Sequence, residues 1–154
     1  METMIVVVDE AAYALKMLRP LLPADAAQHP SHATHWIVLD CTPNVTHDVS
    51  KWVSPEALAL WREDRANEVF AQIVPMLQRP GDKVTTQLAS HKLPLVAQTE
   101  ALIAQHGQAQ VLDARRPKFG QDLEPVTADQ PQEHNSVARY VAAVAAAGLL
   151  VALD

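Results

Sequence analysis

The sequence contains one cysteine and four glycines, and its longest apolar run is short. Cys41 has no partner for an internal disulfide, which suits a reducing compartment. The run from Tyr140 to Leu153 falls short of the roughly 20 residues that cross a bilayer, and the first residues lack the basic start of a signal peptide. We therefore expect a cytoplasmic protein with no membrane partner. The sequence has no glycine-rich phosphate loop and no Gly-x-Ser-x-Gly nucleophile motif.

Positive charge is also scarce. Lysine and arginine number 12 against 18 aspartates and glutamates, for a net charge of -6. This balance argues against nucleic acid as a partner, because non-specific binding to nucleic acid needs clustered positive charge. The length of 154 residues and the hydrophobic fraction of 49% fit one globular domain that spans residues 1–154.

Short apolar runs alternate with helix-forming segments along the chain. Continuous apolar runs indicate strands that are buried on both faces, as in a parallel sheet. The pattern predicts an α/β fold with a doubly wound, five-stranded parallel sheet and helices on both faces. The strands are expected at 5–8, 36–39, 84–88, 110–112 and 149–153, and the helices at 11–18, from Pro55 to the Arg79-Pro80-Gly81 stop, at 94–106 and at 137–147.

The segment 114–135 does not fit a minimal version of this fold. It is polar and contains Pro117, Pro125 and Pro131, so we expect a long loop there. Loops of this length are usually functional or disordered.

Three of the predicted strands end at an aspartate: Asp9, Asp40 and Asp113. Ligands of open α/β sheets bind beyond the carboxyl ends of the strands, so these carboxylates are candidate ligand-binding residues, with Arg115 and Arg116 facing an anion. The alternative interpretation is structural, because aspartates after strands often cap helices or loop amides and loop arginines are often solvated.

The histidines and the cysteine do not form a recognisable site. We interpret His29, His32, His35 and His47 as solvated loop histidines, because Pro30 interrupts the triplet and zinc needs a defined tetrahedral ligand set. Cys41 follows a predicted strand with no base beside it in the sequence, which favours a buried structural thiol. We assign no catalytic residue and no metal ligand.

The chain resembles the universal stress proteins. The resemblance rests on the opening run Ile5–Asp9, on the long second helix, on the helix led by Pro94, and on the segment 135–141, which is similar to the family's Gly-Ser-Val-Ala segment. It implies the family's adenine-nucleotide α-hydrolase-like fold, with strand order 3-2-1-4-5 and a homodimer. The family's phosphate-binding glycines fall here on Asp113, Arg116 and Asn135, and Ser136 alone matches the phosphate-binding set.

Three hypotheses follow. The first is a regulatory or interaction protein that forms a homodimer through its C-terminal strand (Leu149, Leu150, Val151, Ala152 and Leu153) and has no cofactor, since ATP binding in the family's usual way needs the missing glycines. The second is a protein that binds an adenine nucleotide or another anion, with Arg115, Arg116 and Ser136 on the phosphate and Asp9 on a base or sugar. The third is a metal-assisted hydrolase that uses the strand-end carboxylates.

Overall fold

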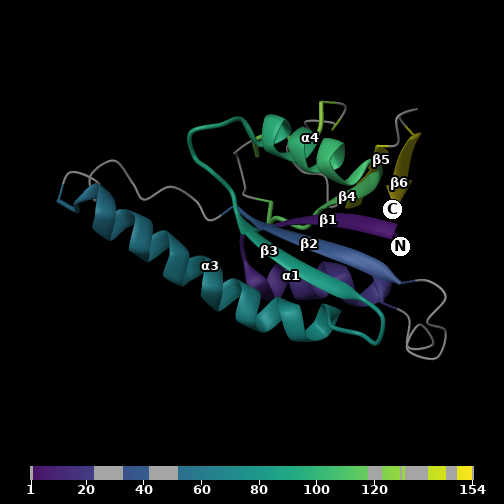
Figure 1. Cartoon of the computed structure of the whole chain (residues 1–154), viewed down its shortest axis with the longest axis horizontal. Helices are drawn as coiled ribbons and strands as arrows, with labels where there is room; N and C mark the ends of the chain where they lie inside the picture. Colours follow the sequence, from purple (N-terminus) through teal and green to yellow (C-terminus); the bar gives the residue numbers. More distant parts are fainter. Residues whose placement is uncertain are drawn as a thin grey trace.

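The computed structural model describes residues 2–22, 33–41, 52–117, 123–128, 130, 139–144 and 149–153, the last two ranges as backbone. Its elements alternate between strand and helix up to β4 and end in two strands (Figure 1). The strands are β1 (Glu2–Val8), β2 (Thr34–Asp40), β3 (Lys83–Leu88), β4 (Ala109–Asp113), β5 (Arg139–Val144) and β6 (Leu149–Leu153). The helices are α1 (Ala11–Leu18), the 3-10 turn η1 (Arg19–Leu21), α3 (Pro55–Leu77) and α4 (Leu95–His106).

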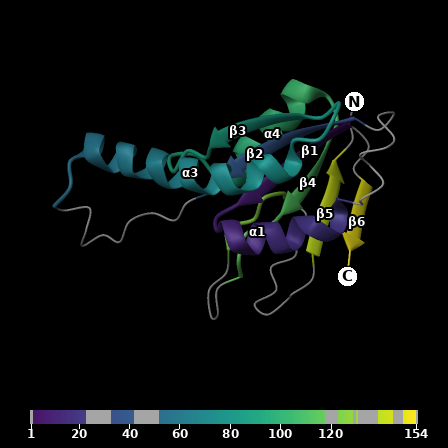
Figure 2. The ribbon, with the colours of Figure 1, turned by 90° about the horizontal axis from the view of Figure 1, so that it is seen from below.

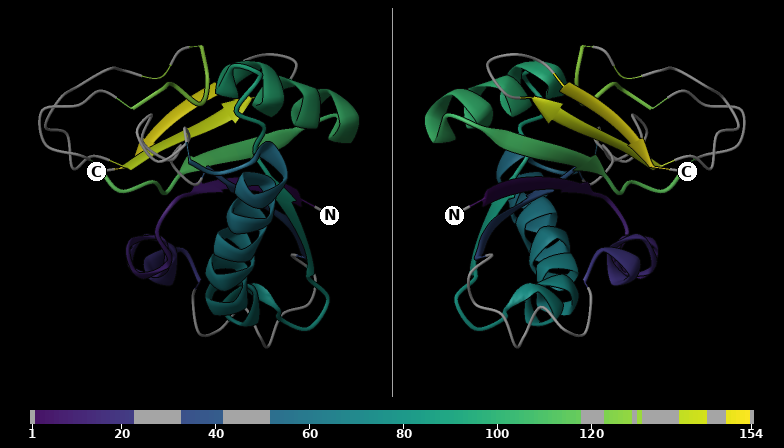
Figure 3. Two further views of the ribbon diagram at one scale, coloured as in Figure 1. Left: turned by 90° about the vertical axis from the view of Figure 1, so that its left-hand side faces the viewer. Right: turned by 90° about the vertical axis from the view of Figure 1, so that its right-hand side faces the viewer.

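The first four strands form a parallel sheet in the order β3-β2-β1-β4. Helices α1 and α3 cover one face of this sheet and α4 covers the other, as Figures 2 and 3 show. The predictions of an α/β fold, of parallel strands and of helices on both faces are therefore confirmed for this part of the chain.

Alternation along the strands divides the core into two layers. Val6 and Val8 of β1 pack with residues of α1 and α3, whereas Ile5 and Val7 pack with residues of α4. All four valine and isoleucine side chains are completely buried. Because side chains alternate between the faces of a strand, an apolar residue at every position is what a strand covered on both faces requires.

The second half of the sheet differs from the prediction. β5 lies where a helix over 137–147 was predicted, and it pairs antiparallel with β4 and with β6, so the sheet has six strands. Helix propensity is weak enough that tertiary pairing can override it. The alanine-rich sequence of β5 pairs with the free side of β4, with Ala109 opposite Val144. Ser136 and Gly148, which the prediction placed at the ends of that helix, lie outside the described residues.

Helix α3 begins where the sequence predicts. The side chain of Ser54 accepts a hydrogen bond from the main-chain N–H of Ala57 at 3.1 Å, and Pro55 occupies the first turn. Buried residues occur only in the second half of the helix, from Ala66 onward, and no residue of 55–65 is buried. The first half of α3 therefore extends past the carboxyl ends of the strands (Figure 1).

Candidate functional site

The carboxyl ends of the four parallel strands meet at one edge of the sheet. In the ladder, Asp40 of β2 lies opposite Val8 of β1 and Leu88 of β3, and Asp113 of β4 lies opposite Val7. The main-chain bonds continue one residue further: Cys41 N–H donates to the Val8 carbonyl at 2.7 Å. Parallel pairing thus brings together residues that are far apart in the sequence.

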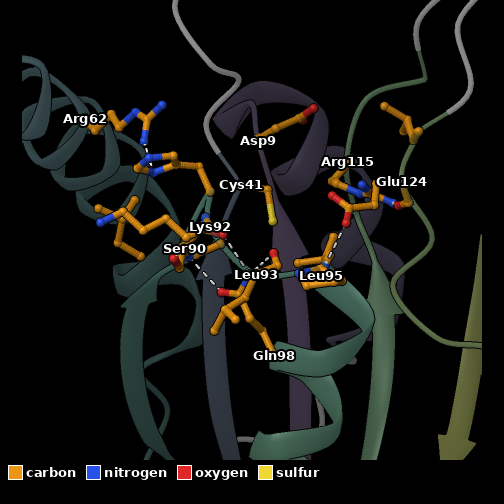
Figure 4. Close-up of a pocket in the computed structure, with 15 residues that line it drawn as sticks. Asp9, Cys41, Arg62, Ser90, Lys92, Leu93, Leu95, Gln98, Arg115 and Glu124 are labelled. Atoms are coloured by element: carbon orange, nitrogen blue, oxygen red, sulfur yellow. Dashed lines mark hydrogen bonds between the residues drawn. The ribbon is translucent and has the colours of Figure 1, made fainter.

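A cavity of about 480 Å³ opens above this edge, on the α4 side of the sheet. We call it the carboxyl-edge pocket. Cys41, which follows β2, lies at its base, residues 88–95 form one wall, and Arg115 and Glu124 form the other (Figure 4). Asp9, which follows β1, and Leu123 also line it. Pockets that hold small organic molecules usually measure roughly 300–1,000 Å³ and have several apolar walls. The leucines at 88, 93, 95 and 123 supply such walls here.

On the β4 side of the pocket, a buried ion pair joins Asp113 and Arg115. The Arg115 Nε and Nη2 atoms donate to the two carboxylate oxygens of Asp113 at 2.8 and 2.9 Å. The side chains are only 5% and 11% exposed, so solvent screens the pair weakly. Burial works against the charge of Arg115, but the hydrogen bonds and the attraction of Asp113 outweigh it and raise the pKa of Arg115.

The same side is tied to the long loop that follows β4. Arg115 Nη2 also donates to the main-chain carbonyl of Glu124 at 2.5 Å, and the Gln130 amide donates to Asp113 at 2.6 Å. The Glu124 carboxylate accepts the N–H of Leu95 at 2.9 Å, which places a negative charge at the start of α4. This part of the loop is therefore a structural wall of the pocket.

Asp9 and Arg116 meet at the edge of the pocket. The Asp9 carboxylate accepts the main-chain N–H of Arg116 at 2.9 Å, which joins the ends of β1 and β4. The guanidinium of Arg116 forms an ion pair with Glu10 at 3.1 Å, and both side chains are about half exposed or more. Of the predicted ligand-binding residues that the structure describes, only Asp9 and Arg115 line the pocket.

Asp40 is completely buried and does not line the pocket. Strand alternation explains this, because Asp40 shares the face of Val38, which packs against α1 and α3, while Cys41 turns toward α4. Within the described residues, no group of three or more histidine, cysteine, aspartate or glutamate side chains could hold a metal ion, so Asp9, Asp40 and Asp113 do not form one. Ser136 lies outside the described residues.

Cys41 presents its sulfur at the base of the pocket (Figure 4). Burial raises the pKa of the thiol to about 12, and the aspartates at 40, 113 and 9 add to the effect while Arg115 opposes it. The raised pKa favours the neutral thiol, which is a weaker nucleophile than the thiolate. The structural role expected from the sequence stays a prediction.

The turn after β3 was not singled out by the sequence, and it supplies most of one wall. Gln98 of α4 fixes it with three hydrogen bonds: its carbonyl oxygen accepts the Ser90 N–H at 2.7 Å, and its amide donates to the carbonyls of Ser90 and Leu93 at 2.8 and 3.0 Å. Gln98 is itself buried. The wall is held in place by a side chain beneath it.

Arg62 reaches the pocket from the projecting half of α3. It lies beside the turn after β3 and hydrogen-bonds the Nδ1 atom of His91, and Lys92 follows in the same wall. Figure 4 shows Arg62 and Lys92 on the side of the cavity opposite Arg115 and Glu124. The position of 90–92 just after a predicted strand was a usable signal for the turn. No local sequence pattern identifies Arg62 as a pocket residue, because its position at the pocket depends on how far α3 extends past the ends of the strands.

The histidine prediction fails at His35, which lies in β2 and is buried. Its Nε2 is 2.7 Å from the Thr85 hydroxyl, and its ring packs edge-on against that of His106 with centroids 5.1 Å apart. Burial, followed by the charges of Lys83 and His106, lowers the pKa of His35. His29, His32 and His47 lie outside the described residues.

Fold and site together define an α/β protein with a pocket at the carboxyl edge of a parallel sheet. Comparisons with protein-family models, with curated proteins and with solved structures find no match. In the part of the chain that the structure describes, no helix is both long and apolar enough to span a membrane.

Proposed function

We propose that this chain is a regulatory protein of the universal-stress-protein type that binds a small organic molecule in the carboxyl-edge pocket. The observation that carries the proposal is the pocket itself: a cavity of about 480 Å³ at the edge where open α/β sheets bind ligands. Its walls come from both sides of the sheet edge, so a ligand there contacts residues from the ends of several strands.

The lining suggests the chemistry of the ligand. Leu93 and Leu95 offer apolar surface to a flat ring system, while Asp9 offers a carboxylate to hydroxyl or amino groups. A nucleoside combines these features. A triphosphate is a poor occupant of the β4 side, because Asp113 stands where the family has a glycine, and a carboxylate repels an anion.

Thermal unfolding of the purified protein with adenosine, AMP and ATP tests the proposal. A ligand present at about 100 times its Kd adds roughly 2.7 kcal/mol to the free energy of unfolding, so Tm should rise by several degrees. Ala89→Phe, which places a ring in the pocket, should abolish the rise. Ala104→Phe, on the exposed surface of α4, should keep it. Equal shifts in both variants, or no shift with any of the three compounds, would contradict ligand binding at this pocket.

We also propose a homodimer through β6. This strand is the last in the sheet order, and its sequence Leu-Leu-Val-Ala-Leu is entirely apolar. An apolar edge strand invites pairing with another chain, and a two-fold symmetric dimer satisfies it.

Size-exclusion chromatography with light scattering tests the dimer. Val151→Asp should give a monomer, and Thr86→Asp in β3, at the opposite edge of the sheet, should leave the dimer intact. A folded Val151→Asp protein that elutes with the mass of the wild type would rule out pairing through β6.

A further inference from the structure

The two arginines that the sequence assigned to an anion are already paired within the protein. Arg115 binds both oxygens of Asp113, and Arg116 binds Glu10. An anionic group on the β4 side would have to compete with these carboxylates. It would also lie near Glu124, whose side chain lines the same wall.

The α3 side of the pocket has a different set of lining residues. Arg62, His91 and Lys92 line it together, and no carboxylate stands among the lining residues from α3 and from the turn after β3. Within the described residues, neither His91 nor Lys92 takes part in an ion pair. Among the described lining residues, the carboxylates are Asp9 and Glu124, which belong to the segments after β1 and β4.

The hydrogen bond between Arg62 and His91 determines which nitrogen of the ring carries a proton. Since Nδ1 of His91 accepts from the guanidinium, the proton of the neutral ring lies on Nε2, which remains a donor. Arginine, lysine and an imidazole N–H are the donors that bind phosphate oxygens in proteins.

The main chain that carries His91 and Lys92 is also held in position. Gln98 fixes the main chain of Ser90 and Leu93, and the Ser90 hydroxyl accepts the N–H of Lys92 at 3.2 Å. Arg62 is half-buried and comes from a helix, so its main chain is rigid. A fixed main chain reduces the entropy that is lost when these side chains bind an anion.

We propose that Arg62, His91 and Lys92 form an anion subsite that binds a single phosphate group of the ligand in the carboxyl-edge pocket. The proposal rests on the function proposed above and names its ligand class as a phosphomonoester, with its uncharged ring system in the apolar part of the pocket. The phosphate lies on the α3 side, across the cavity from Glu124.

The pair adenosine and AMP tests this directly, because the two compounds differ only in the phosphate. AMP should bind roughly tenfold more tightly than adenosine, as one or two charge-assisted hydrogen bonds provide. Arg62→Met and Lys92→Met should each reduce that advantage without weakening adenosine. Arg65→Met, on the exposed side of the same helix, and Arg116→Met should keep it.

The outcomes separate the two proposals. If adenosine and AMP bind equally well, the pocket binds its ligand and the anion subsite is wrong. If the advantage of AMP is lost in Arg116→Met and kept in Arg62→Met, the phosphate lies on the β4 side and the subsite is again wrong.

A second probe needs no nucleoside. Inorganic pyrophosphate, titrated at constant ionic strength, should shift the ring signals of His91 in a saturable way, and Lys92→Met should weaken the binding. These signals are assigned by their loss in His91→Gln. An absence of saturable shifts at millimolar pyrophosphate would overturn the subsite even if neither adenosine nor AMP binds.

Discussion

On the β4 side of the carboxyl-edge pocket, Arg115 forms an ion pair with the Asp113 carboxylate and donates a hydrogen bond to the Glu124 carbonyl. On the α3 side, Arg62 hydrogen-bonds His91 and lies near Lys92, and the described lining residues of α3 and of the turn after β3 include no carboxylate. The first arginine holds a long loop against the sheet, and the second extends toward the cavity from a projecting helix. The two arginines of the pocket therefore have different neighbours, and these neighbours determine which groups each guanidinium can bind.

The largest expected effect comes from breaking the buried pair. Asp113→Ala leaves the Arg115 charge buried without its partner, which should lower the free energy of unfolding by about 3–5 kcal/mol in urea denaturation. The double variant Asp113→Ala with Arg115→Met removes both charges and should recover much of the loss. A decrease of less than about 1 kcal/mol for the single variant would mean that the pair is not buried in solution.

Removing Gln98 should have an intermediate effect, because this side chain supports the α3-side wall. Gln98→Ala leaves the Ser90 N–H and the Leu93 carbonyl without their bonds, at a cost of about 1–3 kcal/mol. The Ser90 amide should exchange faster with solvent in the variant. Gln105→Ala, an exposed glutamine of the same helix, is the matched control and should change neither quantity.

Cys41, at the base between the two sides, should make stability fall at alkaline pH. In the unfolded chain the thiol loses its proton above about pH 9, whereas in the folded protein its pKa is about 12. The folded state therefore binds more protons than the unfolded state in this window, so the free energy of unfolding falls as pH rises. Relative to Cys41→Ala, the wild type should lose about 1 kcal/mol between about pH 8 and about pH 10. A constant difference between the two proteins would contradict the burial of the thiol.

The smallest effect is expected at the exposed pair of Arg116 and Glu10. Glu10→Gln should change the free energy of unfolding by at most about 1 kcal/mol, and the change should shrink in high salt. Set against Asp113→Ala, this variant measures how much burial adds to an ion pair at the same edge of the sheet. An effect as large as that of Asp113→Ala would contradict the difference in stabilisation that we expect between the buried pair and the exposed pair.

The parallel half of the fold could be predicted from the sequence because its signals are local. The run Ile5–Val8 is apolar at every position, and Ser54 with Pro55 marks a helix start that the structure reproduces. The prediction fails at β5, where the pairing partner decides the outcome and the alanine-rich sequence alone favours a helix. Local sequence patterns do not indicate which strand has an edge available for pairing.

The site was predicted only in part for a similar reason. The carboxyl-edge rule pointed to Asp9 and Arg115, which line the pocket, because it depends only on where strands end. The rule says nothing of how a side chain there is used, so the sequence could not reveal that Arg115 is paired with Asp113. Arg62 lies beyond the rule altogether, because it reaches the edge from the side of a helix.

The proposed ligand of the carboxyl-edge pocket is a small phosphorylated molecule whose phosphate lies on the α3 side. The most direct test is a titration of the labelled protein with AMP, followed by amide chemical shifts. We expect saturable shifts concentrated at Cys41, at 88–95 and at Arg62, with smaller changes elsewhere. Shifts centred on Arg116 and the loop after β4, or no saturable shifts at all, would contradict this proposal.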